Sequence, residues 1–190
     1  MHLLYQQAFN VLWVAWLIYW GIAAIGARPT RYRESVISSQ LHIVPLLVGI
    51  VLLVSPRLAG NWLTQRYLPR WPAWFFVGLL LTVLGLGFAV YARAWLGRNW
   101  SGTVTLKEDH ELIRGGPYRW VRHPIYTGIL LAVLGSAIAT GEWRGLLALA
   151  LITVAFLRKI TVEERILTGQ FGDAYRRYQA EVPALLPGVY

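Results

Sequence analysis

Residues 123–157 read HPIYTGILLAVLGSAIATGEWRGLLALALITVAFL, and this segment is the clearest indication of the fold class. Its first part, 123–141, carries no Asp, Glu, Lys or Arg, and neither does 145–157. Only the tripeptide Glu-Trp-Arg at 142–144 separates the two uncharged segments. Because about 20 apolar residues in a helix cross the roughly 30 Å hydrocarbon layer of a bilayer, the pattern predicts two membrane helices joined by a tight hairpin.

The same pattern recurs toward the N-terminus. Three further stretches, 1–27, 35–56 and 71–91, are free of charged side chains and long enough to span. The segment 145–157 is short, so we expect its helix to continue past Arg158 and Lys159, whose side chains would reach toward the interface. The predicted fold class is an all-α integral membrane protein with about five transmembrane helices, the last of which leaves the membrane.

The composition supports a membrane protein. Of the 190 residues, 56% are hydrophobic and 14% are charged, against about 25% charged in an average globular protein. A soluble domain of this size could not bury so much apolar surface in one core. The absence of cysteine excludes disulfides and thiolate chemistry.

The distribution of positive charge predicts the orientation. With five spans, only four of the 18 Lys and Arg residues fall on one face, namely Arg57, Arg66, Arg70 and Arg144. Cytoplasmic loops carry the excess of Lys and Arg, so we expect the N-terminus outside and the C-terminus in the cytosol. This distribution explains the net charge of +9 without a nucleic-acid partner.

We expect a single domain over 1–190. Three spans fill 1–92, and a loop, the hairpin and a C-terminal tail fill 93–190. The polar regions 93–122 and 158–190 lie on one side of the membrane in this topology, so any soluble ligand would be bound there, on the cytosolic side.

The loop 97–128 is rich in Gly, Pro, His, Arg and aromatic residues, a mixture typical of irregular backbone around a ligand. Gly115-Gly116-Pro117 predicts a turn, and Pro124 suits the first turn of the next helix. His123 and Tyr126 fit two interpretations: interfacial anchors or ligand-binding residues.

The tail, VEERILTGQFGDAYRRYQAEVPALLP over 162–187, has apolar residues at helical spacing, which predicts an amphipathic helix. Glu163 and Glu164 are either solvated charges or an acidic pair that meets a cationic ligand. Four histidines are too few for a histidine-rich di-iron centre, so no metal site is expected. No dinucleotide-binding glycine motif and no P-loop is present.

An ordered set of motifs over 99–187 resembles the isoprenylcysteine carboxyl methyltransferase family, whose C-terminal plan the related phospholipid N-methyltransferases share. The motifs are His110-Glu111-Leu112-Ile113, Gly116-Pro117-Tyr118, Arg122-His123-Pro124-Ile125-Tyr126-Thr127-Gly128, Glu163-Glu164, Phe171-Gly172, Tyr175 with Tyr178, Val182-Pro183 and Pro187. Ala184 departs from the pattern, because many bacterial members carry Arg after Val-Pro.

The resemblance implies a membrane methyltransferase that uses S-adenosyl-L-methionine, releases S-adenosyl-L-homocysteine and has no Rossmann fold. Arg158 and Lys159 would bind the substrate. Lys159 occupies the position at which the family carries a basic residue that faces the acceptor carboxylate, but a lysine cannot bind a carboxylate bidentately as an arginine does. By position, the cofactor would be bound by His110, Glu111, Leu112, Ile113, Tyr118, His123, Pro124, Ile125, Tyr126 and Glu163.

The expected chemistry suits these residue types. Aromatic faces and the carboxylate of Glu163 stabilise a sulfonium cation. A carboxylate acceptor needs no general base, whereas an amine acceptor does, and Glu164 is the candidate. We also expect Glu163 to lie at the surface, so that Glu163→Ala would weaken cofactor binding without unfolding the protein.

The two basic side chains favour an anionic, lipophilic acceptor that enters from the bilayer, and carboxyl O-methylation of a prenylcysteine-like substrate is the leading hypothesis. A phospholipid amine or a small thiol is the alternative acceptor. A second alternative is an NADPH-dependent enzyme like the sterol reductases, in which the HPxY motif continues into Gly-Glu, whereas Thr127-Gly128 follows here.

Overall fold

The computed structural model describes residues 2–25, 36–97 and 112–188. Within these ranges the chain is helical, with no β-strand, so the predicted all-α class is confirmed. The helices are α1 (His2–Ala24), α2 (Val36–Val54), α3 (Pro72–Leu96), α4 (Pro124–Thr140), α5 (Trp143–Phe171) and α6 (Asp173–Glu181), with two 3-10 turns, η1 (Pro56–Leu58) and η3 (Gly116–Arg119).

Each of the five uncharged stretches forms one of the helices α1 to α5. Among the described residues, α1, α3 and α5 are long and apolar enough to cross a membrane, while α2 and α4 are shorter apolar helices. Side chains on their outer faces are apolar and exposed, as Val11, Leu47 and Leu80 are, at 66%, 54% and 58%. Such surfaces suit lipid contact, and the chain is an integral membrane protein.

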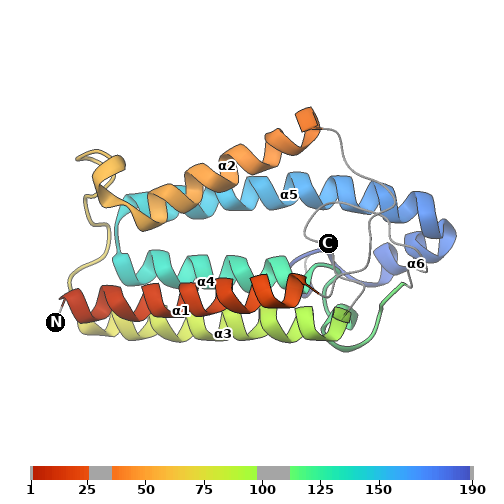
Figure 1. The fold of residues 1–190 in the computed structure, drawn as a ribbon, viewed down its shortest axis with the longest axis horizontal. Coiled ribbons are helices and arrows are strands. Elements are labelled where there is room, and N and C mark those ends of the chain that lie inside the picture. Colours follow the sequence, from red (N-terminus) through yellow and green to blue (C-terminus); the bar gives the residue numbers. More distant parts are fainter. Residues whose placement is uncertain (1, 26–35, 98–111, 189–190) are drawn as a thin grey trace.

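The long helices alternate in direction along one bundle (Figure 1). Helix α4 packs against both α3 and α5, while α2 packs against α5 and α1 against α3. The end of α5, the start of α4 and α6 therefore meet at one end of the bundle (Figure 1). The connection from α2 to α3 and the α4–α5 hairpin lie at the opposite end.

Glycines bring α3 and α4 into backbone contact. A Cβ atom at Gly85 would lie 2.5 Å from the carbonyl oxygen of Gly128, and one at Gly78 would lie 2.4 Å from that of Gly135. Small residues let membrane helices approach closely and gain packing contacts that lipid tails cannot replace. This contact fixes the start of α4 beside the end of α3.

Arginine side chains satisfy carbonyl groups at helix C-termini, which have no partner inside the helix. Arg144 donates to the carbonyls of Leu52 and Leu53 at 2.8 and 2.6 Å, at the end of α2. Arg66 donates to Thr140 at the end of α4, and Arg93 donates to Ala23 at the end of α1. Several of the basic residues thus stabilise helix ends.

The last long helix extends well past the apolar segment, as predicted. Helix α5 continues through Arg158 and Lys159 to Phe171. Gly172 then adopts a φ of 53°, a left-handed value that glycine tolerates, and the chain turns into α6. The amphipathic helix predicted within 162–187 is divided at Gly172: its first part is the end of α5, and its second part is α6, in which Tyr175 and Tyr178 are buried.

Candidate functional site

The turn before α4 positions the first of the site residues. Gly116 has a φ of 59°, and a Cβ atom there would lie 2.4 Å from the ring of Trp95, so the backbone passes directly over the end of α3. The predicted Gly-Gly-Pro turn is thereby confirmed. The 3-10 turn η3 follows, and His123 then precedes Pro124 at the start of α4.

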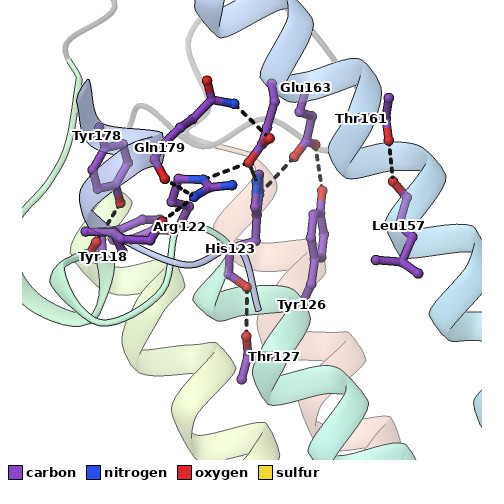
Figure 2. A network of polar contacts seen from close by, with 12 residues as sticks. Tyr118, Arg122, His123, Tyr126, Thr127, Leu157, Thr161, Glu163, Tyr178 and Gln179 are labelled. Atoms are coloured by element: carbon purple, nitrogen blue, oxygen red, sulfur yellow. Dashed lines mark hydrogen bonds and ion pairs between the residues drawn. The ribbon is translucent and has the colours of Figure 1, made fainter. Parts of the chain in front are cut away.

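His123 lies between the two glutamates of α5. Its Nε2 atom is 3.0 Å from Oε1 of Glu164, and its Nδ1 atom is 3.5 Å from Oε2 of Glu163. The ring is 7% exposed, and the two carboxylates are 20% and 16% exposed. Figure 2 shows the imidazole pointing from α4 toward α5. The expectation that Glu163 is a surface residue was wrong, because α4 covers it.

The two carboxylates determine the protonation of this histidine. Burial lowers the pKa of His123, but hydrogen bonds and charge interactions with Glu163 and Glu164 outweigh that effect, and the net pKa is raised. A carboxylate at each ring nitrogen stabilises the imidazolium, in which both nitrogens are donors.

Tyr126 completes an aromatic and acidic surface beside His123. Its hydroxyl donates a 2.6 Å hydrogen bond to Oε1 of Glu163, as Figure 2 shows. Its ring is stacked with His123 at 5.7 Å between centroids and with Phe156 at 4.7 Å. Nζ of Lys159, one turn before Glu163, lies 5.6 Å from the Tyr126 centroid. A carboxylate, an aromatic face and an ammonium group thus share one site.

Glu164, unlike Glu163, forms a hydrogen bond with a side chain of α6. Arg122 Nε donates to its Oε1 at 2.8 Å, and Nε2 of Gln179 donates to its Oε2 at 2.9 Å. Arg122 also donates through Nη1 to the carbonyls of Gln179 and Val182, at the end of α6. Both oxygens of Glu164 are therefore occupied, and the α6 helix is attached to α5 through this side chain.

The segment after α6 returns across the start of α4. The backbone N–H of Arg122 donates to Pro183 at 2.9 Å, and that of His123 donates to Ala184 at 3.0 Å. Thr127 Oγ1 donates to the Leu185 carbonyl at 2.7 Å. The tail thus orients the residue that lies between the two glutamates.

Tyr118 lies next to this cluster but faces α3. Its hydroxyl contacts the Ala92 carbonyl at 3.4 Å, and its own carbonyl accepts a 2.5 Å hydrogen bond from Tyr178. Burial raises the pKa of Tyr178 to about 12, so its hydroxyl keeps the proton that it donates. Tyr118 links α3, the turn and α6.

The remaining predicted residues occupy different places. Pro124 and Ile125 are buried in the first turn of α4, and Leu112 packs with the Tyr175–Tyr178 cluster of α6. Ile113 is half-buried. Arg158 turns away from the glutamates and donates to Ser38 Oγ at 2.9 Å. His110 and Glu111 lie outside the described residues.

Arg122 and Gln179 both donate hydrogen bonds to Glu164, yet neither was predicted from the sequence to be a site residue. Arg122 belongs to the Arg-His-Pro motif, and its place beside His123 was a usable signal. Gln179 has no such signal, because its role depends on how α6 folds back onto α5.

Comparisons with known proteins agree with the motif resemblance. A family model described as phospholipid methyltransferase matches residues 73–174. The protein-S-isoprenylcysteine O-methyltransferase of Schizosaccharomyces pombe is 36% identical over 99 residues, 50% of this chain and 42% of that protein. Methanethiol S-methyltransferase 1 of Bradyrhizobium diazoefficiens is 40% identical over 70 residues, 37% of this chain and 24% of that protein.

A solved structure of the eukaryotic intramembrane Ras methyltransferase ICMT (isoprenylcysteine carboxyl methyltransferase) superposes with a TM-score of 0.53 and 26% identity. The match covers 80% of this chain and 52% of that one. The chain therefore spans about half the length of these methyl-transferring relatives, or less. The family model matches more than half of the chain and includes α3, α4, the turn before α4 and both glutamates. The chain therefore belongs to the phospholipid methyltransferase family, to which the isoprenylcysteine carboxyl methyltransferases are related.

Proposed function

We propose that this protein is an integral membrane, S-adenosyl-L-methionine-dependent methyltransferase that acts on a lipophilic carboxylate, and a prenylcysteine-like carboxyl is the leading acceptor. One observation carries the proposal: the Glu163 carboxylate, the Tyr126 ring and the Lys159 ammonium meet at one site, within the family match. The S. pombe and ICMT relatives are named for isoprenylcysteine methylation.

The residues present fit the cofactor. A sulfonium cation is stabilised by a carboxylate and by aromatic faces, which Glu163 and Tyr126 supply side by side. When bound, the cofactor supplies an electrophilic methyl group. The chain's own contribution is to position the two reactants in line and to exclude water, and the stacked rings of His123, Tyr126 and Phe156 support that arrangement.

The contacts of Lys159 and Arg158 indicate the chemical class of the acceptor. Lys159 lies over the Tyr126 ring and can meet an acceptor carboxylate, whereas Arg158 contacts Ser38 on α2. We propose Lys159 as the substrate-binding residue, and the contact of Arg158 favours a structural role for it. An ionised carboxylate needs no base. Since both oxygens of Glu164 already accept hydrogen bonds, we propose Glu164 as a positioning residue rather than a general base.

A thiol or an amine is the second class of acceptor, because the chain is similar to a methanethiol S-methyltransferase and matches the phospholipid methyltransferase family model. An amine must lose a proton before it attacks, and the occupied Glu164 makes that route less favourable. In the proposed topology the N-terminus is outside, the site is cytosolic, the cofactor enters from the cytosol and the lipid enters sideways between helices.

The test is titration calorimetry of the detergent-solubilised protein with S-adenosyl-L-homocysteine, and with NADPH in parallel. Saturable binding of the homocysteine compound alone supports the proposal, and binding of NADPH alone would transfer the site to a reductase. We expect Glu163→Gln to weaken binding about tenfold or more, because a charge-assisted contact is lost. Glu181→Gln is the matched control, since Glu181 is 56% exposed and pairs with Arg114.

The acceptor is then screened with a farnesylated cysteine, a phosphatidylethanolamine and a short alkyl thiol, and methyl transfer is measured for each. Lys159→Ala should reduce methylation of the farnesylated cysteine alone, with cofactor binding retained. Equal losses for all three acceptors would show that Lys159 does not recognise a carboxylate.

A further inference from the structure

The two ring nitrogens of His123 meet different carboxylates at different distances. Nε2 lies 3.0 Å from Oε1 of Glu164, an oxygen that also accepts a 2.8 Å hydrogen bond from Arg122. Nδ1 lies 3.5 Å from Oε2 of Glu163, whose other oxygen accepts from the Tyr126 hydroxyl. The Nδ1 side of the ring therefore has the longer carboxylate contact, and it faces the glutamate that we propose to meet the sulfonium (Figure 2).

The cluster around His123 has an excess of positive charge when this histidine is protonated. Among its described members, three side chains are then positive and two are negative, so the net charge is +1: Arg122, His123 and Lys159 against Glu163 and Glu164. A further positive charge in such a cluster is unfavourable. Of the three cations, an imidazolium loses its proton most readily, since the reference pKa values of lysine and arginine lie above 10.

The tyrosines that border the cluster do not carry charge. The Tyr126 ring is stacked on His123, and its hydroxyl donates a hydrogen bond. Burial raises the pKa of Tyr118, Tyr175 and Tyr178, so these hydroxyl groups keep their protons. His123 is therefore the described member of the cluster whose charge can change closest to neutral pH.

We propose that His123 lets the site distinguish S-adenosyl-L-methionine from S-adenosyl-L-homocysteine, because it releases its Nδ1 proton to water when a positive charge occupies Glu163. The two compounds differ by one methyl group and by the charge at sulfur. The N–H electron pair stays on Nδ1, and Nε2–H still donates to Glu164. The proposal rests on the proposed function, since it takes Glu163 as the sulfonium contact.

The coupling is reciprocal. Binding of the sulfonium compound lowers the pKa of His123, and loss of the proton strengthens that binding. Glu163 and Glu164 raise the pKa of His123 in the unliganded protein, so the effect develops as the pH rises above about 6.5. We expect the ratio of the Kd of S-adenosyl-L-homocysteine to that of S-adenosyl-L-methionine to rise about tenfold or more, because like charges a few ångströms apart in a protein interact that strongly.

The test is titration calorimetry of the detergent-solubilised protein with each compound, from about pH 6.5 upward, in two buffers that differ in ionisation enthalpy. The difference in heat between the buffers gives the number of protons released per ligand bound. We expect S-adenosyl-L-methionine to release more protons than S-adenosyl-L-homocysteine. His123→Gln should bind both compounds without this difference, and its ratio of Kd values should no longer change with pH.

The matched control is His2→Gln, at the start of α1 and at the opposite end of the bundle (Figure 1), which should leave proton release unchanged. Equal proton release by the two compounds in the unmodified protein would overturn the proposal while the proposed function stands, and this comparison does not depend on the folding of any variant. A difference that persists in His123→Gln would also overturn it. Absence of binding by either compound at every pH would contradict the proposed function itself.

Discussion

The hydroxyl of Tyr126 donates a 2.6 Å hydrogen bond to the carboxylate of Glu163, so that a ring on α4 and a charge on α5 form one unit. The ring is held by stacking on His123 and Phe156. Its hydroxyl then sets the orientation of the carboxylate, which is the group that we propose to face the sulfonium.

Tyr126→Phe tests this unit, because it keeps the ring and removes the hydroxyl. We expect affinity for S-adenosyl-L-homocysteine, measured by calorimetry, to fall about tenfold, since a hydrogen bond to a charged group contributes about 1.5–3 kcal/mol. Tyr67→Phe is the control, because the Tyr67 hydroxyl contacts the Ala137 carbonyl at the other end of the bundle. Unchanged affinity in both variants would contradict the coupling.

Gln179→Leu tests the attachment of α6 to the site. The Oε2 atom of Glu164 loses its donor, which leaves a nearly buried carboxylate under-paired and costs about 1–3 kcal/mol of stability. We expect a lower unfolding temperature and a several-fold lower kcat with a smaller change in KM, because Glu164 positions His123 without touching substrate. Gln170→Leu, at an exposed position on α5, should change neither value.

His123 predicts a pH dependence of stability. Its folded-state pKa is raised above the unfolded value of about 6.5. The folded state therefore binds the proton more tightly, and this stabilisation is complete below about pH 6.5 and is lost as pH rises through the raised pKa. We expect the unfolding temperature in detergent to fall as the pH rises above about 6.5 and through the raised pKa of His123, and His123→Gln to flatten that slope. An identical slope in the variant would assign it to another group.

The packing of α3 on α4 predicts different results for two neighbouring glycines. Gly85→Ala places a methyl group 2.5 Å from Gly128 O, and overpacking of this kind costs about 1–3 kcal/mol. Gly87→Ala meets nothing within 4 Å, so the better helix propensity of alanine should leave stability equal or slightly higher. Thermal unfolding of the two variants checks both expectations, and equal behaviour would contradict the close approach.

The helices were predictable from the sequence because charge is absent over five long stretches and membrane helices need little else. The turn at Gly116 was predictable for a local reason, since glycine and proline restrict backbone geometry wherever they occur. His123, Tyr126 and Glu163 were assigned by motif resemblance, and the structure brings them together. Their roles in binding stay predictions.

The contacts between segments distant in sequence were not predictable. Burial of Glu163 follows from α4 lying over α5, and the engagement of Glu164 follows from the position of Gln179 on α6. Arg158 and Lys159 are adjacent in sequence, yet one contacts α2 and the other contacts Tyr126. Helical rotation separates neighbours by about 100°, and only the placement of the surrounding helices decides which neighbour each one meets.

The tail that crosses the start of α4 has a consequence for biosynthesis. The backbone N–H groups of Arg122 and His123 bond to Pro183 and Ala184, and Arg122 also needs the carbonyls of α6. These partners leave the ribosome some sixty residues after the residues that they orient. A nascent chain that ends with α5 thus contains all five hydrophobic helices but lacks the partners that orient Arg122 and His123.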